Sequence, residues 1–141
     1  MPEKVVIDGH ELWHGDCREV LPLLAPVDLV LTDPPYGIDY GNAGGFSEKS
    51  GWKDWRGKAE WDKERPAPWL FGLMREKGDA CIVWGGNYFT DVLPPTMRWL
   101  VWDKGQRNFT LADCEFAWSS ENKAARVLTL PRAEAAQDGK E

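Results

Sequence analysis

The sequence predicts an α/β fold whose sheet consists mostly of parallel strands. Strand and helix patterns alternate along the chain: an apolar run at 27–32 precedes a helix pattern at 66–77, which precedes a second apolar run at 79–84. Further strand patterns follow at 97–103 and 114–120. Because alternating strands and helices are typical of parallel sheets, we expect ligands to bind beyond the carboxyl ends of these strands.

The first elements of the chain are short. Residues 5–7 and 12–14 read as two strands around a DGH turn. Asp16 is the expected N-cap of a helix, because Glu19 follows three residues later in a capping-box pattern. Pro22 restricts this helix to a few residues.

Residues 27–32 predict a strand that is buried on both faces, because their apolar side chains do not alternate with polar ones. Residues 37–64, in contrast, show no periodicity and are rich in glycine, serine and charge. Long loops inside a compact domain are usually functional or disordered. We therefore interpret 37–64 as a flexible loop at the functional site.

The second half of the chain contains a helix pattern at 66–77, which Gly78 ends, and a buried strand follows it. The GGNYF segment at 85–89 predicts a glycine turn that leads into a short helix. Residues 125–130 are a candidate last strand, and the polar tail 131–141 is expected to fray. The predicted domain therefore covers residues 1–130.

Composition narrows the function classes. The chain has 141 residues, which suits one domain, and its net charge of −6 argues against a surface that binds nucleic acid throughout. No apolar stretch approaches the roughly 20 residues that span a bilayer, so we expect a cytoplasmic protein without a membrane partner. Three cysteines without CxxC spacing and two histidines give no sign of a metal site or of a disulfide framework.

The candidate catalytic residues lie in the segment LTDPPYG, at the end of the strand 27–32. Pro34 and Pro35 fix the backbone after Asp33 and have no N–H to donate. The Asp33 carboxylate and the Pro34 carbonyl thus present two acceptors, which suit an amino group with two N–H bonds. Tyr36 adds a flat face that can stack on a planar ring. A DPPY turn alone is a weak signal, since such a turn can also simply end a strand.

The wider pattern resembles the DPPY amino-methyltransferases, which methylate the exocyclic nitrogen of adenine or cytosine in DNA. It resembles the branch in which the catalytic motif comes early in the chain. The resemblance covers residues 12–130. It implies the incomplete Rossmann-like sheet of a methyltransferase that uses S-adenosylmethionine as methyl donor. The segments that carry it are GDCREVLPLL, VDLVLTDPPYGIDYG, IVWGGNYF, RWLVWDKGQ and ADCEFAW.

The resemblance implies roles for the motif residues. Asp33 and Pro34 would accept the amino protons of the target, Pro35 would hold the turn, and Tyr36 would stack on a base flipped out of the duplex. It also places Asp16, Cys17 and Asp33 at the cofactor, the first two near its adenosine part. For Asp16 the helix N-cap is an equally good interpretation, and both can hold.

DNA contact is expected from the loop 37–64, where basic residues alternate with acids and tryptophans; a solvated loop of mixed charge is the alternative. The candidate contacts are Lys49, Lys53, Arg56 and Lys58. A cytosine carbon-5 methyltransferase is excluded, because that class needs a nucleophilic cysteine directly after a proline. No proline directly precedes Cys17, Cys81 or Cys114. Cys81 and Cys114 read as core thiols. Aspartate as the first motif residue favours adenine over cytosine.

The resemblance also implies a TQKP-like segment and a DPFxGSG glycine turn for the methyl donor, and the sequence contains neither. Without the strand under that turn, 27–32 would present an apolar edge that a second polypeptide, a second copy or the amino-terminal strands must cover. Three hypotheses remain open. The chain is the half of a split N6-adenine DNA methyltransferase that carries the catalytic motif, active only with a partner that carries the cofactor turn; or it is a truncated, inactive remnant that still folds; or it is a nucleic-acid-binding module that kept the base pocket and lost catalysis.

Overall fold

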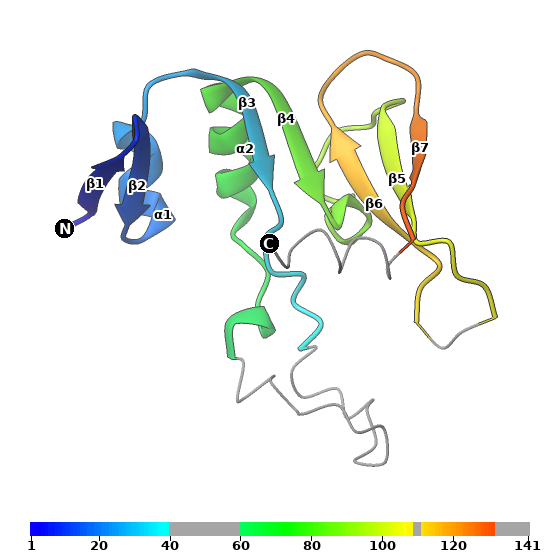
Figure 1. Cartoon of the computed structure of the whole chain (residues 1–141). Coiled ribbons are helices and arrows are strands. Elements are labelled where there is room, and N and C mark those ends of the chain that lie inside the picture. The colour runs from blue at the N-terminus through cyan, green and yellow to red at the C-terminus, as the bar shows by residue number, and fades with distance from the viewer. Residues whose placement is uncertain (40–59, 109–110, 132–141) are drawn as a thin grey trace.

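The computed structural model describes residues 1–39, 60–108 and 111–131. These residues form a two-stranded sheet near the amino terminus and a five-stranded sheet that contains the rest of the strands (Figure 1). The predicted DNA-contact residues, at positions 49, 53, 56 and 58, and most of the tail lie outside the described residues.

The two-stranded sheet is a hairpin of β1 (Glu3–Ile7) and β2 (His10–His14). Ile7 pairs with His10, so the connection has two residues. These are Asp8 and Gly9, and both have positive φ angles, 49° and 83°. Two left-handed residues in a two-residue loop match the right-handed twist of the strands. The two predicted strands and their turn are confirmed.

The predicted short helix is α1 (Cys17–Val20), continued by the 3₁₀ helix η1 (Leu21–Leu23). Asp16 is its N-cap, because the Asp16 carboxylate accepts a 2.9 Å hydrogen bond from the Arg18 backbone N–H. Pro22 falls in the 3₁₀ turn, where the α-helix has already ended. The capping and the short length are therefore as predicted.

The larger sheet has the strand order β3-β4-β6-β5-β7 and mixes strand directions. The pairs β3–β4 and β5–β7 are parallel, whereas β4–β6 and β5–β6 are antiparallel. The prediction of a mostly parallel, Rossmann-like sheet is therefore wrong. The strands are β3 (Val27–Thr32), β4 (Gly78–Trp84), β5 (Trp99–Asp103), β6 (Cys114–Ser119) and β7 (Arg126–Thr129).

The connections explain the mixed directions. A parallel pair needs a crossover of about a dozen residues or more, usually a helix. The chain between β3 and β4 contains such a helix, α2 (Pro68–Lys77), and these two strands are parallel as expected. The connection between β5 and β6 spans only 104–113 and contains no helix in its described part, so the strand returns antiparallel.

The core lies between α2 and one face of β4 and β6. Its most buried side chains are Phe71 of α2, Cys81 and Val83 of β4, Phe89, and Trp118 of β6, each at most 2% exposed. Cys81 is the core thiol that the sequence predicted, and burial raises the pKa of its thiol. Cys114 is only half-buried, so the same prediction is too strong for that residue.

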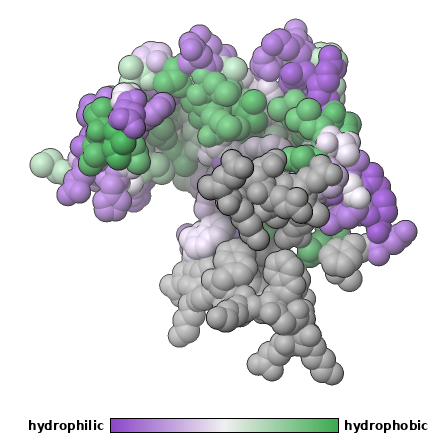
Figure 2. Space-filling model, viewed as in Figure 1, coloured by the Kyte–Doolittle hydropathy of each residue, from purple (hydrophilic) through white to green (hydrophobic). Residues whose placement is uncertain are grey.

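Within the described residues, strand β3 pairs only with β4 and therefore lies at the edge of the sheet. Its side chains Val27, Leu29 and Leu31 are 43%, 46% and 61% exposed, so the prediction of burial on both faces is wrong. The hairpin does not cover this edge, because β1 and β2 pair only with each other. Figure 2 shows hydrophobic residues at the surface over the hairpin and over the neighbouring part of the molecule that carries β3.

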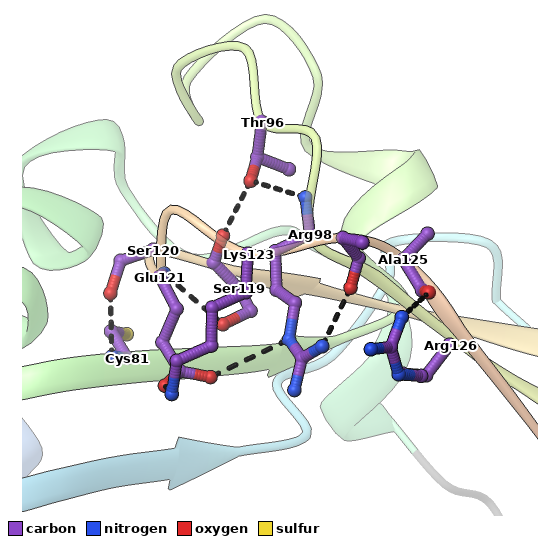
Figure 3. A network of polar contacts seen from close by, with 10 residues as sticks. Cys81, Thr96, Arg98, Ser119, Ser120, Glu121, Lys123, Ala125 and Arg126 are labelled. Carbon is purple, nitrogen blue, oxygen red and sulfur yellow. Dashed lines mark hydrogen bonds and ion pairs between the residues drawn. The ribbon is translucent and has the colours of Figure 1, made fainter.

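A polar network joins the connection between β6 and β7 to the start of β5 (Figure 3). Arg98 donates to the Ala124 carbonyl at 2.6 Å, and its Nε lies 3.5 Å from Glu121 Oε2. Lys123 Nζ is 2.5 Å from the same Glu121 carboxylate. The Thr96 hydroxyl donates to the Ser119 carbonyl at 2.7 Å. None of these residues lines the cavity at the DPPY turn.

Candidate functional site

The DPPY turn and the GGNY turn meet at one end of the sheet. In the parallel pair β3–β4, Thr32 lies opposite Val83, so Asp33 follows β3 where Trp84 ends β4. Gly85 then turns the chain into the 3₁₀ helix η4 (Gly86–Tyr88). The expectation that the motifs meet at the carboxyl ends of adjacent strands is met for these two turns.

Asp33 and Tyr36 are joined by a hydrogen bond. The Tyr36 hydroxyl donates to Asp33 Oδ1 at 2.6 Å. Burial, this hydrogen bond and the nearby charges of Asp33 and Glu115 raise the pKa of Tyr36, so the phenol stays protonated and remains a donor. Asp33 is exposed, and no donor among the described residues bonds to its Oδ2. One carboxylate oxygen is thus held in place, while the other has no hydrogen-bond donor within the described part of the chain.

A buried aspartate outside the motif fixes the turn itself. Asp62, in the 3₁₀ helix η3 (Glu60–Asp62), is 3% exposed. Its Oδ1 accepts from the backbone N–H groups of Tyr36 at 2.8 Å and of Gly37 at 3.1 Å. The Asp39 N–H donates to the Asp62 carbonyl at 2.9 Å. The chain after the prolines is therefore held by hydrogen bonds to a residue 26 positions later.

The Tyr36 ring rests on the GGNY turn. It stacks on Tyr88 with ring centroids 4.7 Å apart and an interplanar angle of 16°. Gly85 touches the same ring so closely that a Cβ at this position would lie 2.1, 2.5 and 2.7 Å from Cε1, Cζ and Cδ1 of Tyr36. All three atoms belong to the Cε1 side of the ring, so the added Cβ would overlap this side of Tyr36. The ring position therefore depends on glycine at 85.

A cavity of about 720 Å³ opens beside these residues. Asp33, Pro34 and Tyr36 form one part of its wall. Side chains of β5, of β6 and of the connection between these two strands form another part. Its volume falls within the roughly 300–1,000 Å³ that is usual for small-molecule sites. Its lining is mainly aromatic and apolar, with a few charged groups. Further lining residues include Trp61, Asn87, Tyr88, Trp102, Lys104 and Glu115.

The structure brings together only part of the predicted site. Asp33, Pro34 and Tyr36 line the cavity, and Pro35 does not. Asn87, which belongs to the GGNYF segment, also lines it. No group of three or more His, Cys, Asp or Glu that could hold a metal ion occurs in the described part of the chain.

The predicted adenosine-binding residues lie elsewhere. Asp16 and Cys17 are at the start of α1 and do not line the cavity. The Asp16 carboxylate is engaged by the Arg18 guanidinium and backbone N–H, and these hydrogen bonds lower the pKa of Asp16 to about 2. In this structure Asp16 is a helix cap, and Cys17 is exposed beside it.

Sequence reasoning missed four residues of the site: Asp62, Tyr88, Lys104 and Glu115. Tyr88 had a usable signal, because it belongs to the glycine turn that was expected at the carboxyl end of β4. Asp62 had none, since it sits in a segment of mixed charge without periodicity. Lys104 and Glu115 meet only through the pairing of β5 with β6, which no local pattern specifies.

Comparisons with protein-family models, with curated proteins and with solved structures found no match for this chain. The site is therefore interpreted from its own geometry. Within the described residues, no helix is both long enough and apolar enough to cross a membrane.

Proposed function

We propose that the cavity beside Asp33 binds a nucleobase of DNA by its exocyclic amino group, and that the chain is the base-binding half of an amino-methyltransferase. Adenine is the proposed target and the cytoplasm the proposed location. The observation that carries the proposal is that Asp33 Oδ2, at the wall of an aromatic cavity, accepts no hydrogen bond from the residues that the structure describes.

The hydrogen-bonding character of the turn supports an amino ligand. Asp33 offers a carboxylate oxygen, and the two prolines after it provide no N–H that would compete for the same acceptor. The hydrogen bond from Tyr36 fixes the orientation of the carboxylate. A group with two N–H bonds gains from such a site, whereas a carbonyl oxygen would meet a negative charge.

The aromatic lining supports a planar ligand. Tyr88 and Trp61 line the cavity and are 40% and 69% exposed, so both present ring surface to a ligand. Stacking on aromatic side chains contributes about 1–3 kcal/mol per base and tolerates any sequence. A base that is flipped out of a duplex or already single-stranded would therefore be held by stacking and oriented by Asp33.

Two of the three residues that the resemblance places at the methyl donor, Asp16 and Cys17, lie away from the cavity, whereas Asp33 lines it. S-Adenosylmethionine is the cofactor that the family resemblance implies, but Asp16 and Cys17 do not line the cavity and Asp16 is already hydrogen-bonded to Arg18. We therefore assign only base binding to this part of the protein. The open edge of β3 is a suitable place for a further strand, from a second polypeptide or a second copy, to join the sheet and bring the donor site.

The first test removes the amino group from the ligand. A single-stranded thymine oligonucleotide with one central adenine is titrated against the same oligonucleotide with purine in place of adenine, followed by fluorescence anisotropy. Loss of the amino group should weaken binding by about tenfold or more, since hydrogen bonds to a charged group contribute about 1.5–3 kcal/mol. Equal affinities for the two oligonucleotides would contradict amino-group recognition.

The second test concerns the methyl donor. We expect isothermal titration of the chain with S-adenosylmethionine to give no heat of binding up to millimolar concentrations. A polypeptide that carries the glycine-rich turn should restore both donor binding and methylation of DNA in a mixture with this chain, and Asp33→Ala in that mixture should abolish methylation. Tight binding of S-adenosylmethionine by the chain alone would contradict the proposal that this chain binds the base but not the methyl donor. Base binding without methylation in any mixture would favour a binding module.

A further inference from the structure

Lys104 is the one lysine or arginine among the described residues that line the cavity. It follows β5 directly, and its backbone N–H donates to the Asp113 carbonyl at 3.0 Å. The side chain is only 10% exposed and runs along Trp102, whose ring centroid lies 5.4 Å from Lys104 Nζ. A lysine so withdrawn from water in an aromatic wall calls for a reason, because burying an ammonium group is costly.

The ammonium group is only partly satisfied by the protein. Its partner is Glu115, whose Oε1 lies 2.5 Å from Lys104 Nζ. An ammonium has three N–H donors, and no second carboxylate or carbonyl among the described residues bonds to this one. Glu115 is itself 42% exposed, so the pair lies at the cavity surface rather than in the core. Donor capacity therefore remains for a ligand in the cavity.

The Lys104–Glu115 pair is electrostatically close to the DPPY turn. The charge of Glu115 contributes to the raised pKa of Tyr36, and the Tyr36 hydroxyl is 2.6 Å from Asp33. A ligand held at Asp33 thus meets an acceptor on one wall and the Lys104 donor on another. In adenine and in cytosine, the carbon that bears the amino group is flanked by a ring nitrogen that accepts hydrogen bonds.

We propose that Lys104 donates a hydrogen bond to this ring nitrogen and so acts as a specificity-determining residue for the base held at Asp33. The inference rests on the proposed function. Together the two residues match an amino group beside a ring acceptor, whereas guanine carries a carbonyl oxygen at the position of the adenine amino group and thymine carries one at the position of the cytosine amino group. A phosphate of the DNA backbone is a less suitable partner, because the Lys104 side chain is only 10% exposed.

The experiment combines a change in the protein with a change in the ligand. The ligands are the adenine oligonucleotide and its 1-deazaadenine and 7-deazaadenine analogues. The first replaces N1, the ring nitrogen bonded to the amino-bearing carbon, and the second replaces N7, which is one atom further from that carbon. The variant is Lys104→Met, which keeps the length and apolar stem and leaves Glu115 solvated. The matched control is Lys123→Met, because Lys123 also lies 2.5 Å from a glutamate but belongs to the network away from the cavity (Figure 3).

We expect the unchanged protein to bind the 1-deazaadenine analogue about tenfold more weakly than adenine, and the 7-deazaadenine analogue about as tightly as adenine. Lys104→Met should bind adenine about tenfold more weakly and should no longer distinguish the 1-deazaadenine analogue, whereas Lys123→Met should behave as the unchanged protein. Thermal unfolding establishes that each variant folds. If Lys104→Met does not fold, Lys104→Gln replaces it and should lower the discrimination, since a neutral amide donor is weaker than an ammonium.

Other outcomes overturn the inference. Full discrimination by Lys104→Met would show that Lys104 does not contact the base. Equal weakening toward all oligonucleotides, with a smaller dependence on salt, would assign Lys104 to a phosphate. Failure of the unchanged protein to prefer adenine over purine would remove the proposed function and this inference together. A preference for adenine that Lys104→Met leaves untouched would remove only the inference.

Discussion

Asp33→Asn should weaken binding of the adenine oligonucleotide about 100-fold, the largest loss expected from a single substitution in the cavity. The amide has one oxygen and one NH2 group in place of two carboxylate oxygens. If its oxygen accepts from Tyr36, its NH2 group faces the amino group of the base, donor against donor. If its NH2 group faces Tyr36 instead, the hydroxyl at 2.6 Å loses its acceptor. A loss of about 2.7 kcal/mol, or 100-fold, is in the range for a hydrogen bond to a charged group.

Asp28→Asn is the matched control for this loss. Asp28 is also an exposed aspartate. It lies on β3, the strand that Asp33 directly follows, and it does not line the cavity. The same loss of one negative charge should change affinity less than about threefold there, so a general electrostatic effect is separated from a contact. Titrations at two salt concentrations complete the comparison. Similar affinities for the Asp33→Asn variant and the unchanged protein would show that the carboxylate does not hold the amino group.

Local patterns predicted the elements around the site because the forces that form them are local. The Asp8–Gly9 turn needs residues that tolerate positive φ, and the sequence supplies them at adjacent positions. The cap at Asp16 is equally local. Helix α2 ends directly before Gly78 as predicted, but Gly78 has an extended backbone and begins β4. The position of the DPPY turn next to Gly85 followed from one parallel unit, β3–α2–β4, which the sequence also indicated.

Strand directions and burial depend on partners that a local pattern does not specify. The apolar run at 27–32 predicted a strand, and it is one, but its burial requires a neighbour on each side and β3 has only β4. In the same way, Lys104 and Glu115 are ordinary charged residues in the sequence. They meet in the cavity because β5 and β6 pair with Trp102 opposite Glu115.

Gly85→Ala should lower the free energy of unfolding by about 2–4 kcal/mol and should weaken base binding in the protein that remains folded. Gly85 has φ of 64°, a conformation that costs an alanine about 1–2 kcal/mol. The added Cβ would also lie 2.1 Å from Cε1 of Tyr36, so the ring or the turn must move, and strain of this kind typically costs about 1–3 kcal/mol. Urea unfolding measures the loss of stability.

Gly72→Ala is the control, because the same methyl group enters α2 with no heavy atom within 4 Å of its position. An alanine in a helix should raise the free energy of unfolding by about 0.5–1 kcal/mol, opposite in sign to the effect at 85. Equal stabilities of Gly85→Ala and the unchanged protein would mean that Tyr36 does not rest on this turn.

Base binding by the folded fraction of Gly85→Ala then tests the link between the two turns. Tyr36 is hydrogen-bonded to Asp33 and stacked on Tyr88, so displacing its ring disturbs both the acceptor and the stacking surface at once. We expect the folded variant to bind the adenine oligonucleotide at least tenfold more weakly, because contacts to a ligand depend on groups held to within a fraction of an ångström. Unchanged affinity in a destabilised variant would instead separate the two roles: the glycine turn would support the fold, and the base would be held by Asp33 without the Tyr36–Tyr88 stack.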